Sequence, residues 1–141
     1  MSDVHDMNEW NRQVIEEFRA NDGEVGGMFA GRTLLLLHHT GARSGLERVN
    51  PLVYRQLGDA VAVFASKGGA PTNPDWFHNL VAHPAVTIEV GSEHRHVIAR
   101  VAAGEERERI WASQKAASPE FAEYEAKAAG RQIPVVVLDP A

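Results

Sequence analysis

The chain has 141 residues, 44% of them hydrophobic and 23% charged, which fits one soluble globular domain with a buried core. Its formal net charge of −5 argues against a general nucleic-acid-binding protein, which would concentrate lysine and arginine. The lack of cysteine excludes a disulfide framework, a thiolate metal site and a cysteine nucleophile. No apolar run approaches the roughly 20 residues that span a bilayer, and no secretory signal pattern opens the sequence, so we expect a cytoplasmic protein.

The N-terminal part is predicted to hold one helix followed by a glycine-rich arm. The helix is predicted over residues 8–20, where four apolar side chains recur at helical spacing: Trp10, Val14, Ile15 and Phe18. We interpret residues 23–31 as a flexible linker docked on the surface; the alternatives are a flap over a cofactor and an arm that associates with a membrane. Residues 1–31 are predicted to form this helix and arm within a single domain spanning residues 1–141.

From residue 33 onward the pattern changes to short strands joined by turns. Strands are predicted over residues 33–38, 49–56, 60–66, 86–90, 95–101 and 133–138, and further helices over residues 72–82, 105–115 and 119–128. Thr72 or Asn73 is the expected cap of the first of these helices, with Pro74 at its first position. Because the first three strands are joined by loops too short for parallel crossovers, we predict an α+β fold built on a small β-barrel with flanking helices.

A basic loop bracketed by two glycines is the first candidate binding element. Gly41 and Gly45 allow backbone conformations that turn successive N–H groups toward one point. Arg43 and Arg48 add planar guanidinium groups that match phosphate or carboxylate oxygens, and Ser44 adds a hydroxyl donor. This combination indicates an anion-binding loop; the alternative is a polar hairpin turn with solvated arginines.

A second candidate element follows the third predicted strand. Ser66 and Lys67 precede two glycines, and the N-terminus of the next helix adds its positive end. Trp76 and Phe77 could wall an aromatic ligand, and Asn79 could hydrogen-bond to its edge. The alternative is that Trp76 packs in the core and Lys67 is solvated. Two such turns after neighbouring strands suit a ligand with several negative charges and a flat apolar ring.

These segments resemble the deazaflavin-dependent nitroreductase family. The first signature of that family is similar to residues 40–52, the second to residues 65–80 and 83–86, and its ending to residues 131–140. The resemblance runs from about Trp10 to Pro140 in the expected order and spacing. It implies a split β-barrel, as in the flavin-binding superfamily, that holds coenzyme F420 in place of FMN.

The resemblance also implies, by position, which residues hold F420. Arg43, Ser44 and Arg48 would bind the phosphate and carboxylates of its tail, while residues 49–53 would line its ring with backbone contacts. The implied cofactor-binding residues are Ala42, Arg43, Ser44, Arg48, Val49, Asn50, Pro51, Leu52, Val53, Phe64, Ala65, Ser66, Lys67, Asp75, Trp76, Phe77, His78 and Asn79.

The implied activity is hydride transfer from reduced F420 to a quinone or nitroaromatic acceptor. Ser66 is a candidate hydrogen-bond donor to the acceptor oxygen, and Tyr124 a candidate wall or proton donor. Where the nitroreductive branch carries a substrate-side tyrosine, this chain has Phe121, which can stack on an aromatic acceptor but cannot donate a proton. The resemblance therefore implies quinone reduction with water as the proton source, and it leaves open whether bulky nitroimidazoles are reduced.

Two other functions stay open: an FMN-, FAD- or heme-binding protein of the same superfamily, and a non-enzymatic F420 carrier. Split-barrel relatives often dimerise, so a homodimer is also kept as a hypothesis. No metal site is predicted. His38 and His39 fall on opposite faces of their strand, and His94 and His96 share a face without an evident carboxylate or cysteine partner.

Overall fold

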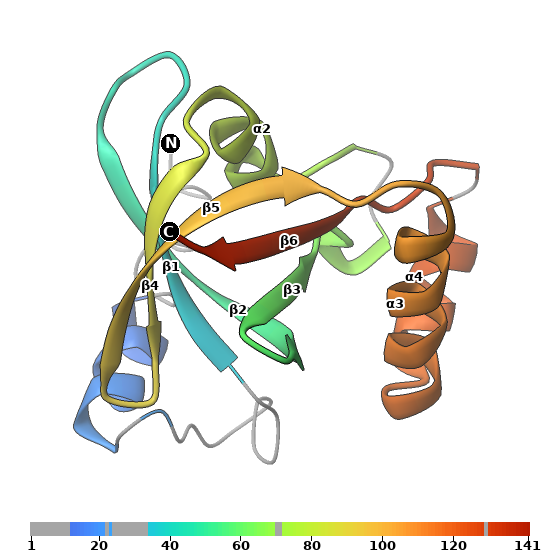
Figure 1. The fold of residues 1–141 in the computed structure, drawn as a ribbon, viewed down its shortest axis with the longest axis horizontal. Helices are drawn as coiled ribbons and strands as arrows, with labels where there is room; N and C mark the ends of the chain where they lie inside the picture. Colours follow the sequence, from blue (N-terminus) through green and yellow to red (C-terminus); the bar gives the residue numbers. More distant parts are fainter. Residues whose placement is uncertain (1–11, 22, 24–33, 70–71, 129) are drawn as a thin grey trace.

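The structure of the protein is a computed structural model that describes residues 12–21, 23, 34–69, 72–128 and 130–141 (Figure 1). Residues 24–31 of the arm predicted over residues 23–31, and the first turn of the predicted N-terminal helix, lie outside these residues. The described elements are a helix over residues 12–20, β1 (Leu34–Thr40), β2 (Glu47–Leu57), β3 (Ala60–Phe64), the 3₁₀ helix η2 (Lys67–Gly69), α2 (Asp75–Ala82), β4 (Ala85–Val90), β5 (Glu93–Val101), α3 (Gly104–Ala117), α4 (Glu120–Lys127) and β6 (Val135–Pro140).

Six antiparallel strands close into a barrel in the order β1-β2-β3-β6-β5-β4, with β4 returning to pair with β1. All six predicted strands are present, with ends within two residues of the expected ones, so the predicted barrel is confirmed. The alternation of side chains sends Leu35 and Leu37 of β1 inward and Leu34 and Leu36 outward. All four are buried, because a helix covers the outer face as well.

The barrel interior is one apolar core that α2 closes at one end. Trp76 and Leu80 of α2 pack into the same cluster as the inward-facing strand residues, so the predicted core alternative for Trp76 holds. Figure 1 shows α2 over the end of the barrel where β1 finishes. The inward-facing cluster includes Leu35, Leu37, Val61, Val63, Ile88, Val97, Val136 and Leu138.

Two helical layers cover parts of the outer surface. Val14 and Phe18 of the N-terminal helix pack on the outward leucines of β1. On another side, α3 and α4 lie beside β3 and β6 (Figure 1). Trp111 of α3 and Phe121 of α4 pack against Phe64 of β3. Among the helices that the structure describes, none is long and apolar enough to cross a bilayer.

A buried carboxylate ties the N-terminal helix to the barrel. Glu89 of β4 is 4% exposed and accepts hydrogen bonds from Arg19 Nε (3.1 Å) and Nη2 (2.7 Å). His38 Nε2 lies 2.6 Å from Glu89 Oε2, and His94 Nε2 lies 3.6 Å from Oε1. The hydrogen bonds from Arg19 lower the pKa of Glu89 to about 2; burial acts in the opposite direction, and His38 adds to the lowering.

The position of Glu89 corrects one expectation from the sequence. No carboxylate was expected beside His94, yet strand pairing sets Glu89 directly opposite it across the β4–β5 ladder. The predicted separation of His38 from His39 is confirmed, because His38 faces this outer cluster and His39 is buried within the barrel end. In the described part of the chain, no group of three histidine or carboxylate side chains could hold a metal ion.

We expect the free energy of unfolding to fall as the pH is lowered from 4.5, the unfolded pKa of Glu89, to about 2, its folded pKa. The charged carboxylate favours the fold, so its contribution is complete above the unfolded pKa and is lost as the folded protein takes up the proton. A shift of this size corresponds to roughly 3 kcal/mol. Urea unfolding of the wild type and Glu89→Gln at about pH 7, 4 and 3 measures it.

The variant should be less stable at neutral pH and lose less stability on acidification. Glu93→Gln, which removes an exposed carboxylate from β5, is the matched control. Parallel pH curves for the wild type and Glu89→Gln would contradict the assignment.

Candidate functional site

The outer face of β2 is left partly uncovered between the two helical layers. Among the described strands, β2 alone has no buried residue, although it pairs with β1 on one side and β3 on the other. Leu52 and Tyr54 pack against the interior cluster, so alternation sends Val49, Pro51 and Val53 outward. The outward residues form a half-exposed apolar strip.

One half of β2 also keeps an open backbone edge. The ladder between β2 and β3 begins at Tyr54, which pairs with Val63, whereas residues 47–53 are paired only with β1. β3 ends at Phe64, and the chain then turns away from β2. Backbone groups on this edge are suited to hydrogen-bond a polar ligand. We call Val49, Pro51, Val53 and the backbone edge of residues 47–53 the β2 shelf.

The first predicted anion loop lies at one end of the β2 shelf. Gly41 N donates to Leu46 O (2.9 Å), and Gly45 N donates to Gly41 O (3.0 Å). Ser44 Oγ accepts from Leu46 N (3.2 Å), which leaves its hydroxyl hydrogen for a ligand. A Cβ on Gly41 would lie 2.3 Å from Ser44 Oγ, so a larger residue there would force the Ser44 side chain to move.

Two cations at this loop have no counter-charge among the residues that the structure describes. Arg43 and Arg48 are exposed, and neither forms an ion pair or side-chain hydrogen bond within the described residues. By contrast, Arg95 and Arg100 of β5 are each paired with carboxylates. Unpaired guanidinium groups at the end of an apolar strip are suited to hold an incoming anion.

The second predicted anion turn begins at the end of β3. Ser66 is 9% exposed, and Lys67 is exposed with its backbone at φ 48°, a left-handed conformation that is rare for lysine. Lys67 Nζ donates to Thr72 Oγ1 (3.3 Å). Gly69, at φ 86°, approaches α4 so closely that a Cβ would lie 2.9 Å from Tyr124 O. The turn and Tyr124 are therefore packed together.

Arg131 holds this turn in place, a role that the sequence did not indicate. Its guanidinium donates to Ala65 O (3.1 Å), Ser66 O (2.9 Å) and the side-chain oxygen of Asn73. The expectation that Asn73 or Thr72 caps α2 is wrong, because Pro74 occupies the N-cap and no side chain caps the helix. The amide of Asn73 is used by Arg131 instead.

A buried polar network ties the first loop to α2. Asn79 Oδ1 accepts from Ala42 N (2.8 Å), and Asn79 Nδ2 donates to His39 Nδ1 (3.0 Å). His39 Nε2 then donates to Asn50 Oδ1 (2.6 Å). Burial lowers the pKa of His39, which favours the neutral ring that this pattern needs. We call these four residues the Asn79 latch.

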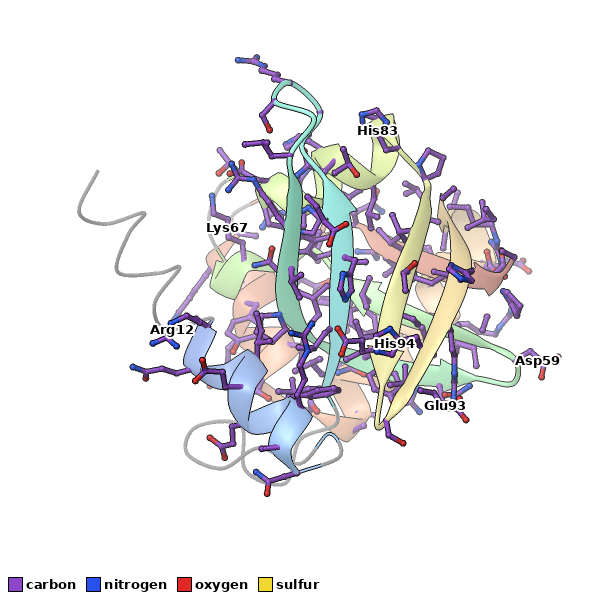
Figure 2. The ribbon with its side chains drawn as sticks, turned by 90° about the vertical axis from the view of Figure 1, so that its left-hand side faces the viewer. Arg12, Asp59, Lys67, His83, Glu93 and His94 are labelled. Atoms are coloured by element: carbon purple, nitrogen blue, oxygen red, sulfur yellow. The ribbon has the colours of Figure 1, made fainter. Side chains whose placement is uncertain are left out.

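The structure brings most of the predicted site to one end of the barrel. β1 ends, β2 begins and β3 ends there, so both turns flank the β2 shelf (Figure 2). Asp75 and His78 are exposed on α2 nearby, whereas Asn50 and Asn79 already use their amides in the latch. The predicted side chains that are not presented there are buried or half-buried elsewhere: Leu52, Phe64, Ala65, Trp76 and Phe77.

Phe77 and Phe121 differ most from their predicted roles. Phe77 lies about 200° around α2 from Asn79 and lines a cavity of about 240 Å³ between α2, β5 and β6. Phe121 is 4% exposed and packs edge-on against two other rings. Its ring centroid lies 5.6 Å from that of Phe64 and 5.3 Å from that of Tyr124. Tyr124 is half-buried, so it is the more accessible of the two predicted acceptor-side rings.

Comparisons with known proteins identify a family for this chain. The profile of a family described as "F420H(2)-dependent quinone reductase" matches residues 10–140. An F420H(2)-dependent quinone reductase of Mycobacterium tuberculosis is 37% identical over 126 residues, which covers 86% of this chain and 83% of the relative.

Solved structures resemble the chain as well. An F420-H2 dependent reductase (FDR-A) has a TM-score of 0.70 and 38% identity, covering 77% of this chain and 95% of its own. A protein described as a domain-swapped dimer has a TM-score of 0.71 and 35% identity. The match covers 96% of this chain and 99% of that protein's chain. The heme storage protein HutZ of Vibrio cholerae shares the fold at 16% identity and a TM-score of 0.59. The match covers 93% of this chain and 90% of the HutZ chain.

Replacing Asn79 with leucine should destabilise the protein and release the first loop. Ala42 N–H and His39 would lose buried partners, which costs about 1 to 3 kcal/mol. Trypsin cleavage after Arg43 should accelerate about tenfold or more, because local opening of the loop becomes easier. Urea unfolding and timed proteolysis measure the two effects, with the exposed Gln132→Leu as control. Unchanged cleavage would mean that the latch does not hold the loop.

Proposed function

The chain belongs to the F420H(2)-dependent quinone reductase family and is an F420-dependent oxidoreductase, and we propose that its cofactor lies along the β2 shelf. The observation that carries this placement is an apolar strip with an open backbone edge, flanked by Arg43, Arg48 and Lys67, which have no carboxylate partner among the described residues.

The chemistry of these residues fits F420, whose tail carries a phospholactyl group and glutamates. Arg43 and Arg48 would bind the phosphate and carboxylates as planar forks, and Lys67 would add a point charge from the other side. The free hydrogen of Ser44 and the backbone N–H groups of its loop would complete the donor set. Val49 and Val53 would lie against the flat ring, with hydrogen bonds from the open edge of β2.

When bound, reduced F420 supplies hydride from C5 of its deazaflavin ring to an electron-poor acceptor. The protein would contribute orientation and charge stabilisation. Ser66 would donate a hydrogen bond to the acceptor oxygen. Tyr124, packed beside the Ser66 turn, would wall the acceptor or give it a proton. Phe121 would position the Tyr124 ring and would not contact the acceptor itself, because its own ring is buried.

Quinones are the proposed acceptors, in keeping with the family description, and nitroaromatics are a further proposal that awaits turnover measurements. A homodimer is proposed on the likeness to a relative that is described as domain-swapped. Cytoplasmic location and membrane association through the arm at residues 24–31 stay predictions from the sequence.

Arg48→Ala and Lys67→Ala should each weaken F420 binding by about 10- to 100-fold, the loss expected for one charge-assisted contact of roughly 1.5 to 3 kcal/mol. Fluorescence titration with F420 measures the dissociation constant. Arg109→Ala, which removes an exposed arginine from α3, is the matched control and should leave it unchanged. Unaltered affinity in both site variants would refute the proposed clamp.

Cofactor identity is tested in the same experiment. The wild type should take up F420 and leave FMN and heme in solution, as followed by absorbance after gel filtration. Turnover of reduced F420 with a soluble quinone separates an enzyme from a carrier. Binding of FMN in preference to F420 would overturn the proposal.

A further inference from the structure

Arg55 is a charged interruption in the outward face of β2. Val53 and Leu57, its neighbours on that face, pack against the cluster that contains Phe64 and Phe121. Tyr124 packs against the same cluster. Arg55 is half-buried and pairs across the ladder with Ala62, which is fully buried. Its side chain therefore leaves the sheet next to the proposed acceptor side of the β2 shelf.

No group in the described part of the chain neutralises this cation. Arg55 forms no ion pair or hydrogen bond there, whereas the arginines of β5 both pair with carboxylates. A half-buried guanidinium has lost part of its hydration, so a missing counter-charge is costly unless a ligand supplies one.

Arg55 is also too far from the first loop to share its anion. It lies seven residues from Arg48 along β2, or about 23 Å at 3.3 Å per residue. Val53, at the near end of the β2 shelf, is only about 7 Å away by the same spacing. Within the described residues, the two unpaired cations of β2 therefore lie beyond opposite ends of the apolar strip, and alternation places only Arg55 on the same face as the strip.

We propose that Arg55 binds the electron acceptor and stabilises the negative charge that forms on it, an inference that rests on the proposed function. A quinone that gains hydride carries two more electrons and one proton, so one oxygen becomes an anion. Water then supplies the second proton, and the product is the hydroquinone. The guanidinium meets the oxygen while it is charged, and it favours acceptors that are already anionic, such as hydroxyquinones.

The binding test uses protein loaded with oxidised F420, so that no reaction occurs. The probes are 2-hydroxy-1,4-naphthoquinone, which is an anion at neutral pH, and neutral 1,4-naphthoquinone. Arg55→Met keeps the apolar stem and removes the charge, Arg55→Lys keeps the charge, and Arg109→Met on α3 is the control. The dissociation constants of both probes and of F420 are measured by calorimetry for each protein.

Arg55→Met should lose about tenfold or more in affinity for the anionic probe and little for the neutral one. Its kcat/KM with 1,4-naphthoquinone should fall about 10- to 100-fold, mainly in kcat, because the charge forms only as hydride arrives. Arg55→Lys should keep most of the affinity for the anionic probe and most of the kcat/KM with 1,4-naphthoquinone. F420 affinity should be unchanged in all variants.

Retention of anionic-probe affinity within twofold in Arg55→Met would overturn the inference. A tenfold loss of F420 affinity would also overturn it, because Arg55 would then belong to the cofactor site. Failure of the wild type to bind F420 would overturn the proposed function itself. If the methionine variant does not fold, Arg55→Gln, which also removes the charge, takes its place with the same expected losses and the same outcomes that would overturn the inference.

Discussion

The early separation of β3 from β2 is the constraint on which the candidate site depends. An antiparallel ladder that ran the full length of β2 would satisfy its backbone on both sides and leave nothing for a ligand. The ladder stops at Tyr54 because the chain turns at Ser66 into a 3₁₀ helix held against α4. Arg131 fixes that turn through two carbonyl groups, so the open edge of β2 is maintained from the opposite end of the chain.

The Asn79 latch couples the stability of the barrel to the position of the first loop. α2 closes the barrel with Trp76 and Leu80, and the same helix reaches the loop through Asn79. A charged group in that place would have to be desolvated, whereas a neutral amide can accept from a backbone N–H and donate to a neutral imidazole at lower cost. The latch therefore gives a fixed loop next to Arg43 and Arg48 without adding a charge that would compete with an anionic ligand.

Much of this architecture could be predicted from the sequence, because strand alternation, glycine turns and helix periodicity are local signals. The barrel, its strands and the two turns follow from such signals. Long-range contacts could not be predicted in this way. Nothing near Arg131 indicates that it reaches Ser66, and nothing near Glu89 indicates Arg19. The positions of the aromatic residues differ from their predicted roles for a related reason. Whether Phe121 faces a ligand or the core depends on how α4 packs, and the sequence of α4 does not specify this.

The overall charge of the protein makes the local cations necessary. With a formal charge of −5, the molecule as a whole repels an anionic cofactor. At physiological ionic strength that repulsion is screened beyond about 8 Å, while contacts within a few ångströms are screened much less. On the proposed placement of the cofactor, binding would then be governed by the charges near the β2 shelf, where Arg48 has no acidic partner among the described residues. Arg95 and Arg100 of β5 are paired with Glu93, Glu106 and Asp139, so these two arginines would compete less for the same anion than the unpaired cations of the proposed site.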